Sequence, residues 1–206
     1  MSSPGSSLDR SRFQNASAPR IEASLRESIR TKEQVLATLV PAIEQAAAML
    51  IEALEAGRKI LLFGNGGSAA DSQHIAAELV GKLAVKRRAL PAIALTTDTS
   101  ALTALGNDFG YDTIFERQVE ALGERGDVAI GISTSGASAN VLAGIRMARQ
   151  RGLRTVGLTG GKGGALAGQV EIALVVPSDN TQRIQESHIT IGHILCELVE
   201  QHFAGK

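Results

Sequence analysis

Five short apolar runs alternate with longer helical patterns after Gly57, and this alternation constrains the fold more than any other feature of the chain. The runs occupy residues 59–63, 91–95, 127–132, 154–159 and 171–176. Helical spacing of apolar residues fills about 68–84, 99–106, 111–123, 138–151 and, more briefly, 163–168, and a last helical pattern covers about 181–203. Strands that alternate with helices are typical of right-handed β-α-β crossovers. The sequence therefore predicts an α/β fold with a doubly wound, mostly parallel five-stranded sheet flanked by helices.

The chain before Gly57 contains a polar tail and two helical patterns. Residues 1–19 are rich in Ser, Pro and Gly, so they offer too little apolar surface to offset the entropy of ordering. We expect residues 1–19 to be a disordered tail and residues 20–206 to form a single domain. Apolar residues keep helical spacing from Ile21 to Leu39, and a second helical run extends from Pro41 to about residue 56. Their apolar stripes suit packing on another subunit, and packing on their own domain explains them equally well.

Length and composition limit the classes of protein that fit. A chain of 206 residues with 44% hydrophobic content suits one domain with a full core. The 21 basic and 21 acidic residues balance, and no basic cluster is interleaved with aromatic residues, so we expect no nucleic-acid partner. A secretory signal and an apolar run of about 18 residues are both missing from the sequence, which predicts a cytoplasmic protein without a membrane role. The single cysteine, Cys196, excludes an intramolecular disulfide and receives no functional role.

In an open parallel sheet, ligands bind beyond the carboxyl ends of the strands, so we expect a ligand site in the loops that follow strands. The loop after the first strand reads Gly-Asn-Gly-Gly-Ser over residues 64–68. Its glycines allow positive φ and close backbone approach, and its amides open the next helix, which outlines an anion or sugar site. An ordinary turn would need only one of these glycines. The spacing does not match the dinucleotide fingerprint, and Asp98 comes too late for it, so nucleotide binding is set aside.

The loop after the third strand is rich in hydroxyl groups. Residues 133–138 read Ser-Thr-Ser-Gly-Ala-Ser and lead directly into a helix. Hydroxyls, exposed amides and the positive end of a helix can together hold a phosphate dianion without Lys or Arg. A helix N-cap explains one serine but not four hydroxyls, so we interpret this loop as a phosphate site. Asn107 and Asp108, after the second strand, suit sugar hydroxyls, and a capped helix end explains them nearly as well.

Imidazole, carboxylate and amide groups occur on two of the expected helices. His74 and Glu78 are four residues apart, which puts both side chains on one helix face within reach of a shared proton or metal ion. Gln185 and His193 are eight residues apart, about 80° round the last helix, so both can border one pocket. An isolated histidine is usually a surface or structural residue. Two histidine-bearing helices around a phosphate loop make a functional site an equal alternative.

Four segments together resemble the phosphoheptose isomerases, also called sedoheptulose 7-phosphate isomerases, of the sugar isomerase (SIS) domain superfamily. These segments are GNGGSAADSQHIAAEL, GNDFGY, STSGASANV and RIQESHITIGHILCELVE, and the resemblance spans about residues 25–205. The serine loop marks the superfamily generally, whereas Glu78 and His193 beside His74 and Gln185 are the specific part. The resemblance implies a SIS domain whose N-terminal helices serve oligomerisation. It also implies a homotetramer with active sites at subunit interfaces.

The resemblance further implies a reaction and a set of site residues. The family converts sedoheptulose 7-phosphate into D-glycero-D-manno-heptose 7-phosphate, the first step toward ADP-heptose and the core of bacterial lipopolysaccharide. The substrate contacts matched by motif are Asn65, Gly66, Gly67, Glu78, Asn107, Asp108, Ser133, Thr134, Ser135, Ser138 and Gln185. The implied ligands of one zinc ion per subunit are His74, Glu78, Gln185 and His193.

The chemistry of an aldose–ketose isomerisation suits these residues. Moving a carbonyl from C2 to C1 needs a base that carries a proton from C1 to C2, and an acid that moves a proton between the two oxygens of an enediol. Glu78 fits the base and His193 the acid, and two imidazoles, a carboxylate and an amide oxygen suit zinc. The alternative is a non-catalytic SIS protein, such as a sugar-phosphate sensor or a protein that binds the bacterial replication initiator. Such relatives lack the acid–base pair, so Glu78 and His193 favour the enzyme.

Overall fold

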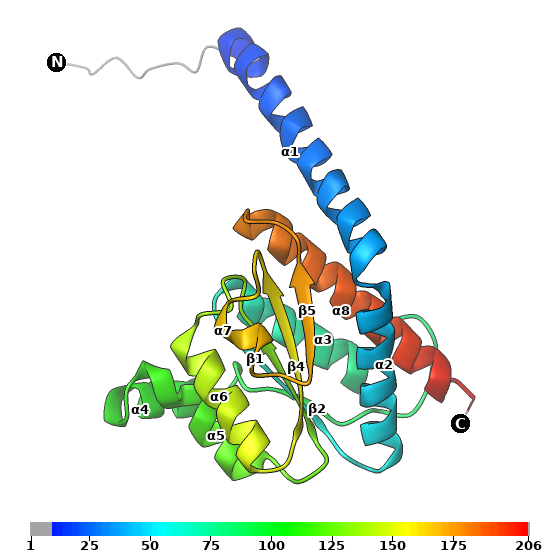
Figure 1. The fold of residues 1–206 in the computed structure, drawn as a ribbon, viewed down its shortest axis with the longest axis vertical. Coiled ribbons are helices and arrows are strands. Elements are labelled where there is room, and N and C mark those ends of the chain that lie inside the picture. Colours follow the sequence, from blue (N-terminus) through cyan, green and yellow to red (C-terminus); the bar gives the residue numbers. More distant parts are fainter. Residues whose placement is uncertain (1–9, 206) are drawn as a thin grey trace, which may run out of the picture.

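A computed structural model describes residues 10–205, with side chains from residue 17 onward (Figure 1). Its sheet contains β1 (Ile60–Gly64), β2 (Ala92–Ala94), β3 (Val128–Ile132), β4 (Arg154–Gly160) and β5 (Ile172–Val176). The strand order is β2-β1-β3-β4-β5, and all neighbouring strands are parallel. The predicted five-stranded α/β sheet is thereby confirmed, and each strand end lies within one residue of its expected position.

Helices cover both faces of the sheet. One face carries α2 (Val40–Glu55), α3 (Gly67–Val80) and α8 (Thr181–Phe203). The other carries α5 (Ile114–Leu122), α6 (Ala139–Gln150) and α7 (Gly164–Ala167), with α4 (Thr99–Asp108) and the short 3-10 helix η1 (Tyr111–Thr113) beside them. Along β1, Ile60 and Leu62 face the first layer, and Leu61 and Phe63 face the second, as strand alternation requires. All four are fully buried, and each contributes about 1.5–3 kcal/mol to stability.

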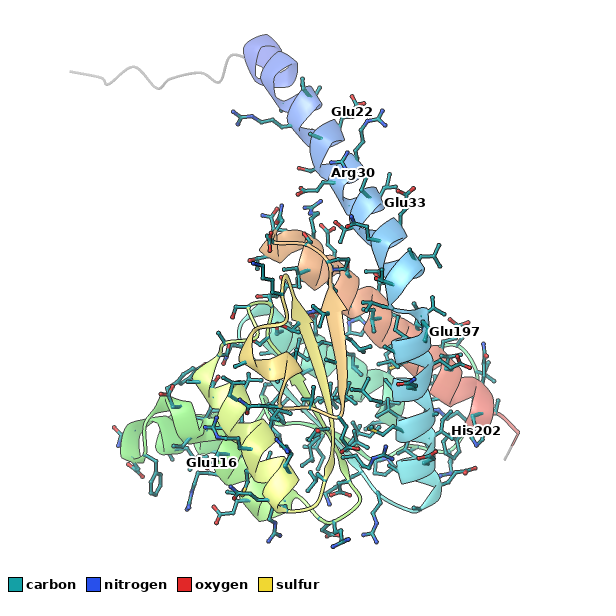
Figure 2. The ribbon with its side chains drawn as sticks, in the orientation of Figure 1. Glu22, Arg30, Glu33, Glu116, Glu197 and His202 are labelled. Atoms are coloured by element: carbon teal, nitrogen blue, oxygen red, sulfur yellow. The ribbon has the colours of Figure 1, made fainter. Side chains whose placement is uncertain are left out.

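Helix α1 (Arg10–Thr38) extends away from the sheet (Figure 1). Its labelled residues Glu22, Arg30 and Glu33 lie along the part of the helix that projects from the domain (Figure 2). The apolar residues of the predicted stripe, Ile21, Leu25 and Ile29, are 58% to 60% exposed. Their apolar surface is therefore left uncovered within this chain.

The start of α1 differs from the sequence expectation. The expected disordered tail included residues 10–19, yet these residues form the first turns of α1, with Pro19 inside the helix. A proline removes one backbone donor and disfavours helix interiors, but helical structure continues on both sides of it here. Residues 1–9 of the expected tail lie outside the described residues.

Helices α1 and α2 meet at a bend of 70° beside the buried residue Leu39. Pro41 lies in the first turn of α2, where its missing N–H costs nothing. Within the described residues, no single helix is long and apolar enough to cross a membrane; residues 17–38 and α2 meet that test only as a bent pair, by length and composition.

The helix expected over 68–84 is too long, because α3 ends at Val80 and a loop follows. Glu200 on α8 holds this loop with a carboxylate that is buried in the structure. It accepts hydrogen bonds of 2.6 to 2.8 Å from the backbone N–H groups of Leu83, Ala84 and Val85. Burial alone would raise the pKa of Glu200, but these amides and Arg87, at 3.7 Å, lower it overall. Helix α3 therefore ends beside Gly81, its C-cap residue, and a contact with α8 holds the loop that follows.

Candidate active site

The loop after β1 places Asn65, Gly66 and Gly67 at the carboxyl edge of the sheet. Gly66 has φ of +56°, a conformation that favours glycine. Gly67 opens α3, and a Cβ at this position would overlap the side-chain amide of Gln185 on α8. The two glycines thus serve different purposes. One turns the chain, and the other lets Gln185 lie across the start of α3.

Two partners hold the side chain of Asn65. Asn65 and the buried Asn140, in the first turn of α6, exchange two amide hydrogen bonds of 2.8 and 2.9 Å. The hydroxyl of Tyr111 donates a third bond to Asn65 Oδ1 at 3.0 Å. The amide pair joins the loop after β1 to the loop after β3. The two expected substrate loops are therefore fixed relative to each other.

The serine loop, residues 133–138, connects β3 to α6. The hydroxyls of Ser133 and Ser138 bond to each other at 2.9 Å, and Ser135 Oγ accepts a bond from the N–H of Ala137 at 3.2 Å. Ser138 occupies the N-cap position of α6, yet its side chain caps no backbone amide. Simple helix capping therefore does not explain Ser138. Thr134 and Ser135 belong to the loop that leads into the N-terminus of α6, whose positive end suits an anion.

Three side chains from α3 and α8 meet in one cluster, which we call the His-Glu-His cluster: His74, Glu78 and His193. The Nε2 atoms of the two imidazoles are 3.0 Å apart, and Glu78 Oε1 lies 3.3 Å from His74 Nε2. One donor atom from each residue lies within 4.8 Å of the others. The structure thus adds His193 to the i,i+4 pair on α3.

The donor atoms of this cluster suit a metal ion. Two imidazole nitrogens and one carboxylate oxygen are ligands that zinc accepts, and a tetrahedral zinc ion bound at about 2.0–2.1 Å holds its ligand atoms roughly 3.3 Å apart. The two shortest separations in the cluster, 3.0 and 3.3 Å, match that spacing. The side chain of His74 is 47% exposed, so an ion has access from solvent. These three residues could therefore hold a metal ion.

Gln185, the fourth expected ligand, lies toward the other end of the same two helices. It contacts Gly67, which precedes His74 by seven residues, or about 10 Å along the axis of α3. Its position on α8 is eight residues before His193, or about 12 Å along that axis. Gln185 therefore borders both the loop after β1 and the approach to the His-Glu-His cluster.

Asn107 and Asp108 end helix α4 and are exposed. Asn107 Nδ2 donates to Asp108 Oδ1 at 2.7 Å. Within the described chain, no side-chain hydrogen bond joins this pair to any of the other expected site residues. Helix α4 has no buried residue and projects beside α5 (Figure 1). Its link to the site runs through η1, where Tyr111 reaches Asn65. The structure thus leaves these two residues at the periphery of the site.

Asp71 lies near the His-Glu-His cluster, and the sequence interpretation did not single it out. Its Oδ2 atom is buried and has no hydrogen-bond partner among the described residues. Burial raises the pKa of Asp71, and the nearby imidazoles of His74 and His193 act in the opposite direction. Asp71 precedes His74 by three residues, a spacing that places it on the same helix face. This three-residue spacing was the sequence signal that could have identified Asp71.

The remaining histidine of this part of α8, His188, has a structural role. It is fully buried, and its Nε2–H donates to the carbonyl of Thr159 at 3.0 Å, since a carbonyl can only accept. Burial lowers the pKa of His188 to about 4, although the bond to Thr159 works against this. His188 is therefore neutral near pH 7 and anchors α8 to β4.

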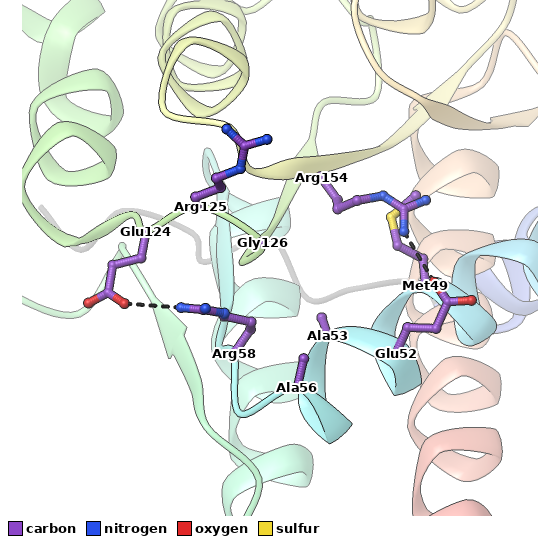
Figure 3. Close-up of a pocket in the computed structure, with 9 residues that line it drawn as sticks. All are labelled: Met49, Glu52, Ala53, Ala56, Arg58, Glu124, Arg125, Gly126 and Arg154. Atoms are coloured by element: carbon purple, nitrogen blue, oxygen red, sulfur yellow. Dashed lines mark hydrogen bonds and ion pairs between the residues drawn. The ribbon is translucent and has the colours of Figure 1, made fainter.

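A cavity of about 540 Å³ lies at the amino edge of the sheet, opposite these loops (Figure 3). Arg58 pairs with Glu124 at 3.5 Å, and Arg154 pairs with Glu52 at 3.2 Å. These ion pairs neutralise the charge of two of the three arginines that line the cavity. None of the expected site residues lines this cavity, so the candidate active site remains at the carboxyl edge.

Comparison with known proteins identifies the family of the chain. Residues 25–160 match the SIS domain family. The phosphoheptose isomerase of Aquifex aeolicus is 57% identical over 182 residues, which cover 88% of this chain and 95% of that protein. The solved phosphoheptose isomerase of Neisseria gonorrhoeae has a TM-score of 0.85 and 47% identity, covering 89% of this chain and 98% of its own. The solved phosphoheptose isomerase of Francisella tularensis has a TM-score of 0.87 and 41% identity, covering 90% of this chain and 98% of its own. The chain therefore belongs to the SIS domain family and, within it, to the phosphoheptose isomerases.

Proposed function

We propose that this chain converts sedoheptulose 7-phosphate to D-glycero-D-manno-heptose 7-phosphate through an enediol. The observation that carries the proposal is the meeting of Glu78 with His193 on helices that pass a hydroxyl-rich loop. A non-catalytic sugar-phosphate binder would use the fold and the serine loop, but it has no need of this acid–base cluster. The proposed reaction is the first step toward ADP-heptose for lipopolysaccharide.

The substrate would extend from the serine loop toward the His-Glu-His cluster. Helix α3 starts three residues after Gly64, the end of β1, and Gly64 pairs with Ile132, the residue before the serine loop. His74 lies about 10 Å further along α3. A seven-carbon sugar phosphate carries its carbonyl and its phosphate near opposite ends. One substrate molecule can therefore place its phosphate at the serine loop and its C1 and C2 at the cluster.

Glu78 would take a proton from C1 and return it to C2, and His193 would move a proton between the two oxygens. A carboxylate has two oxygens, so Glu78 can direct Oε1 toward His74 and use the other for proton transfer. His74, Glu78 and His193 would hold the zinc ion, which when bound would polarise the substrate oxygens, and Gln185 is the expected fourth ligand.

The serine loop is tested by Ser135→Ala. Removing one hydrogen bond to a charged phosphate should raise KM for sedoheptulose 7-phosphate about tenfold or more, with kcat little changed. Steady-state kinetics on the phosphorylated substrate and on unphosphorylated sedoheptulose would measure this, with Ser100→Ala on exposed α4 as the control. An equal loss on both sugars would show that Ser135 does not read the phosphate.

We further propose that the active form is a homotetramer with its sites between subunits. The exposed apolar stripe of α1 and the half-exposed His74 both support a neighbouring subunit at these positions. Light scattering at micromolar concentration should give four times the 21.5 kDa monomer mass, and Leu25→Glu should shift the protein toward smaller species. A monomer mass for the unmodified chain would contradict the proposal.

A further inference from the structure

A second loop faces the serine loop across a cavity at the carboxyl edge of the sheet. This cavity has a volume of about 320 Å³ and lies between the ends of β3 and β4 and the start of α8. Its lining includes Thr134 and Ser135 of the serine loop, Gly161 and Lys162 of the loop after β4, and Asp179 before α8. The cavity therefore combines hydroxyls of the expected phosphate site with an amino group from the loop after β4.

The two loops are built against each other through their backbones. Gly136 has φ of +64°, and a Cβ there would overlap the carbonyl of Gly163. A Cβ on Gly164 would lie 2.5 Å from the carbonyl oxygen of Ser135. The N–H of Leu166 donates to the Gly136 carbonyl at 2.9 Å. Only glycines permit this approach, so the backbone at Lys162 is held in a set position beside the serine loop.

Lys162 is a cation without a carboxylate partner. Within the described chain, no acidic side chain lies within ion-pair distance of its Nζ, and the side chain is exposed at the cavity. Asp179 lines the same cavity and lies near Gly161, where a Cβ would be 3.0 Å from its Oδ1. The cavity thus holds one basic and one acidic side chain, which are not paired with each other.

A phosphate dianion at the serine loop would otherwise meet only partial positive charges. Serine hydroxyls and a helix N-terminus supply dipoles, whereas an ammonium group supplies a full charge on a flexible stem. We propose that Lys162 is a substrate-binding residue that contacts the phosphate through Nζ and sets the preference for phosphorylated sugars. This inference rests on the proposed function, because the phosphate is that of the substrate.

Lys162→Met tests the inference, since methionine keeps much of the length of the stem and removes the charge. KM for sedoheptulose 7-phosphate should rise about tenfold, kcat should stay near the wild-type value, and the dependence of KM on salt should weaken. Lys162→Arg should recover most of the affinity. Lys86→Met, on the exposed loop after α3, is the matched control and should behave as wild type.

Two outcomes would overturn the role of Lys162: an unchanged KM in Lys162→Met, or an equal rise in Lys86→Met. Calorimetry separates this result from a failure of the proposed function. If the wild type binds inorganic phosphate and Lys162→Met binds it more weakly, Lys162 is a phosphate ligand even if sedoheptulose 7-phosphate is not turned over. If both bind phosphate equally, Lys162 has no such role.

Discussion

Replacing Glu78 by glutamine should lower kcat for sedoheptulose 7-phosphate at least about 100-fold. Glu78 is the only carboxylate in the His-Glu-His cluster, and a carboxamide cannot accept a proton from C1. The side chain is 22% exposed, so the substitution should leave the fold intact, as circular dichroism and thermal unfolding would show. Zinc content is measured in parallel, because the same carboxylate lies among the metal donors.

Glu197→Gln is the matched control. Glu197 lies on α8, is exposed, and bonds Gln201 one turn away, so its replacement should not affect turnover. Near-normal activity of Glu78→Gln would refute Glu78 as the base. If Asp71→Asn then lost activity, the half-buried Asp71 carboxylate, one turn before His74, would be the base instead.

Replacing His193 by asparagine should abolish turnover while sugar-phosphate binding persists. Asparagine retains a hydrogen-bonding amide but has no group that titrates near neutrality and no imidazole for a metal ion. Calorimetry should show near-normal binding of sedoheptulose 7-phosphate, because the serine loop is unaffected. Zinc affinity should fall about 10- to 100-fold or more, because one of three clustered donors is lost.

His202→Asn provides the control for this substitution. His202 lies on the same helix and contacts Glu55 at 2.7 Å, away from the cluster, so turnover should be retained. If wild type and His193→Asn both bind the sugar phosphate and neither turns it over, the chain is a binding protein and the proposed enzyme is wrong.

The strands were predictable because their signal is local. Parallel strands covered on both faces read as continuous apolar runs, and ILLF at the start of β1 is fully buried as that pattern predicts. The start of α1 and the loop after α3 were not predictable in the same way. Gly81, the C-cap residue, was a local signal for the end of α3. The loop after it is held by Glu200, which is 120 residues beyond Val80 in the chain and reaches this loop only in the folded domain.

The site shows the same division between local and distant information. The pairing of His74 with Glu78 follows from their four-residue spacing alone. The addition of His193 depends on how closely α8 approaches α3. Gly192 permits that approach, because a Cβ there would lie 2.7 Å from Ile75, the neighbour of His74. Lys162 was overlooked because its loop has no hydroxyl pattern, although it follows a strand of the same parallel sheet.

The most direct test of the account is proton NMR of sedoheptulose 7-phosphate incubated in D₂O with the zinc-loaded wild-type chain. We expect conversion to the aldose heptose 7-phosphate. Deuterium should appear at C2 of the product to the extent that the protonated base exchanges with solvent before it returns its proton. Glu78→Gln under the same conditions should show neither product nor exchange. An unchanged ketose spectrum with the wild-type protein, folded and zinc-loaded, would contradict the assignment of this site as an isomerase.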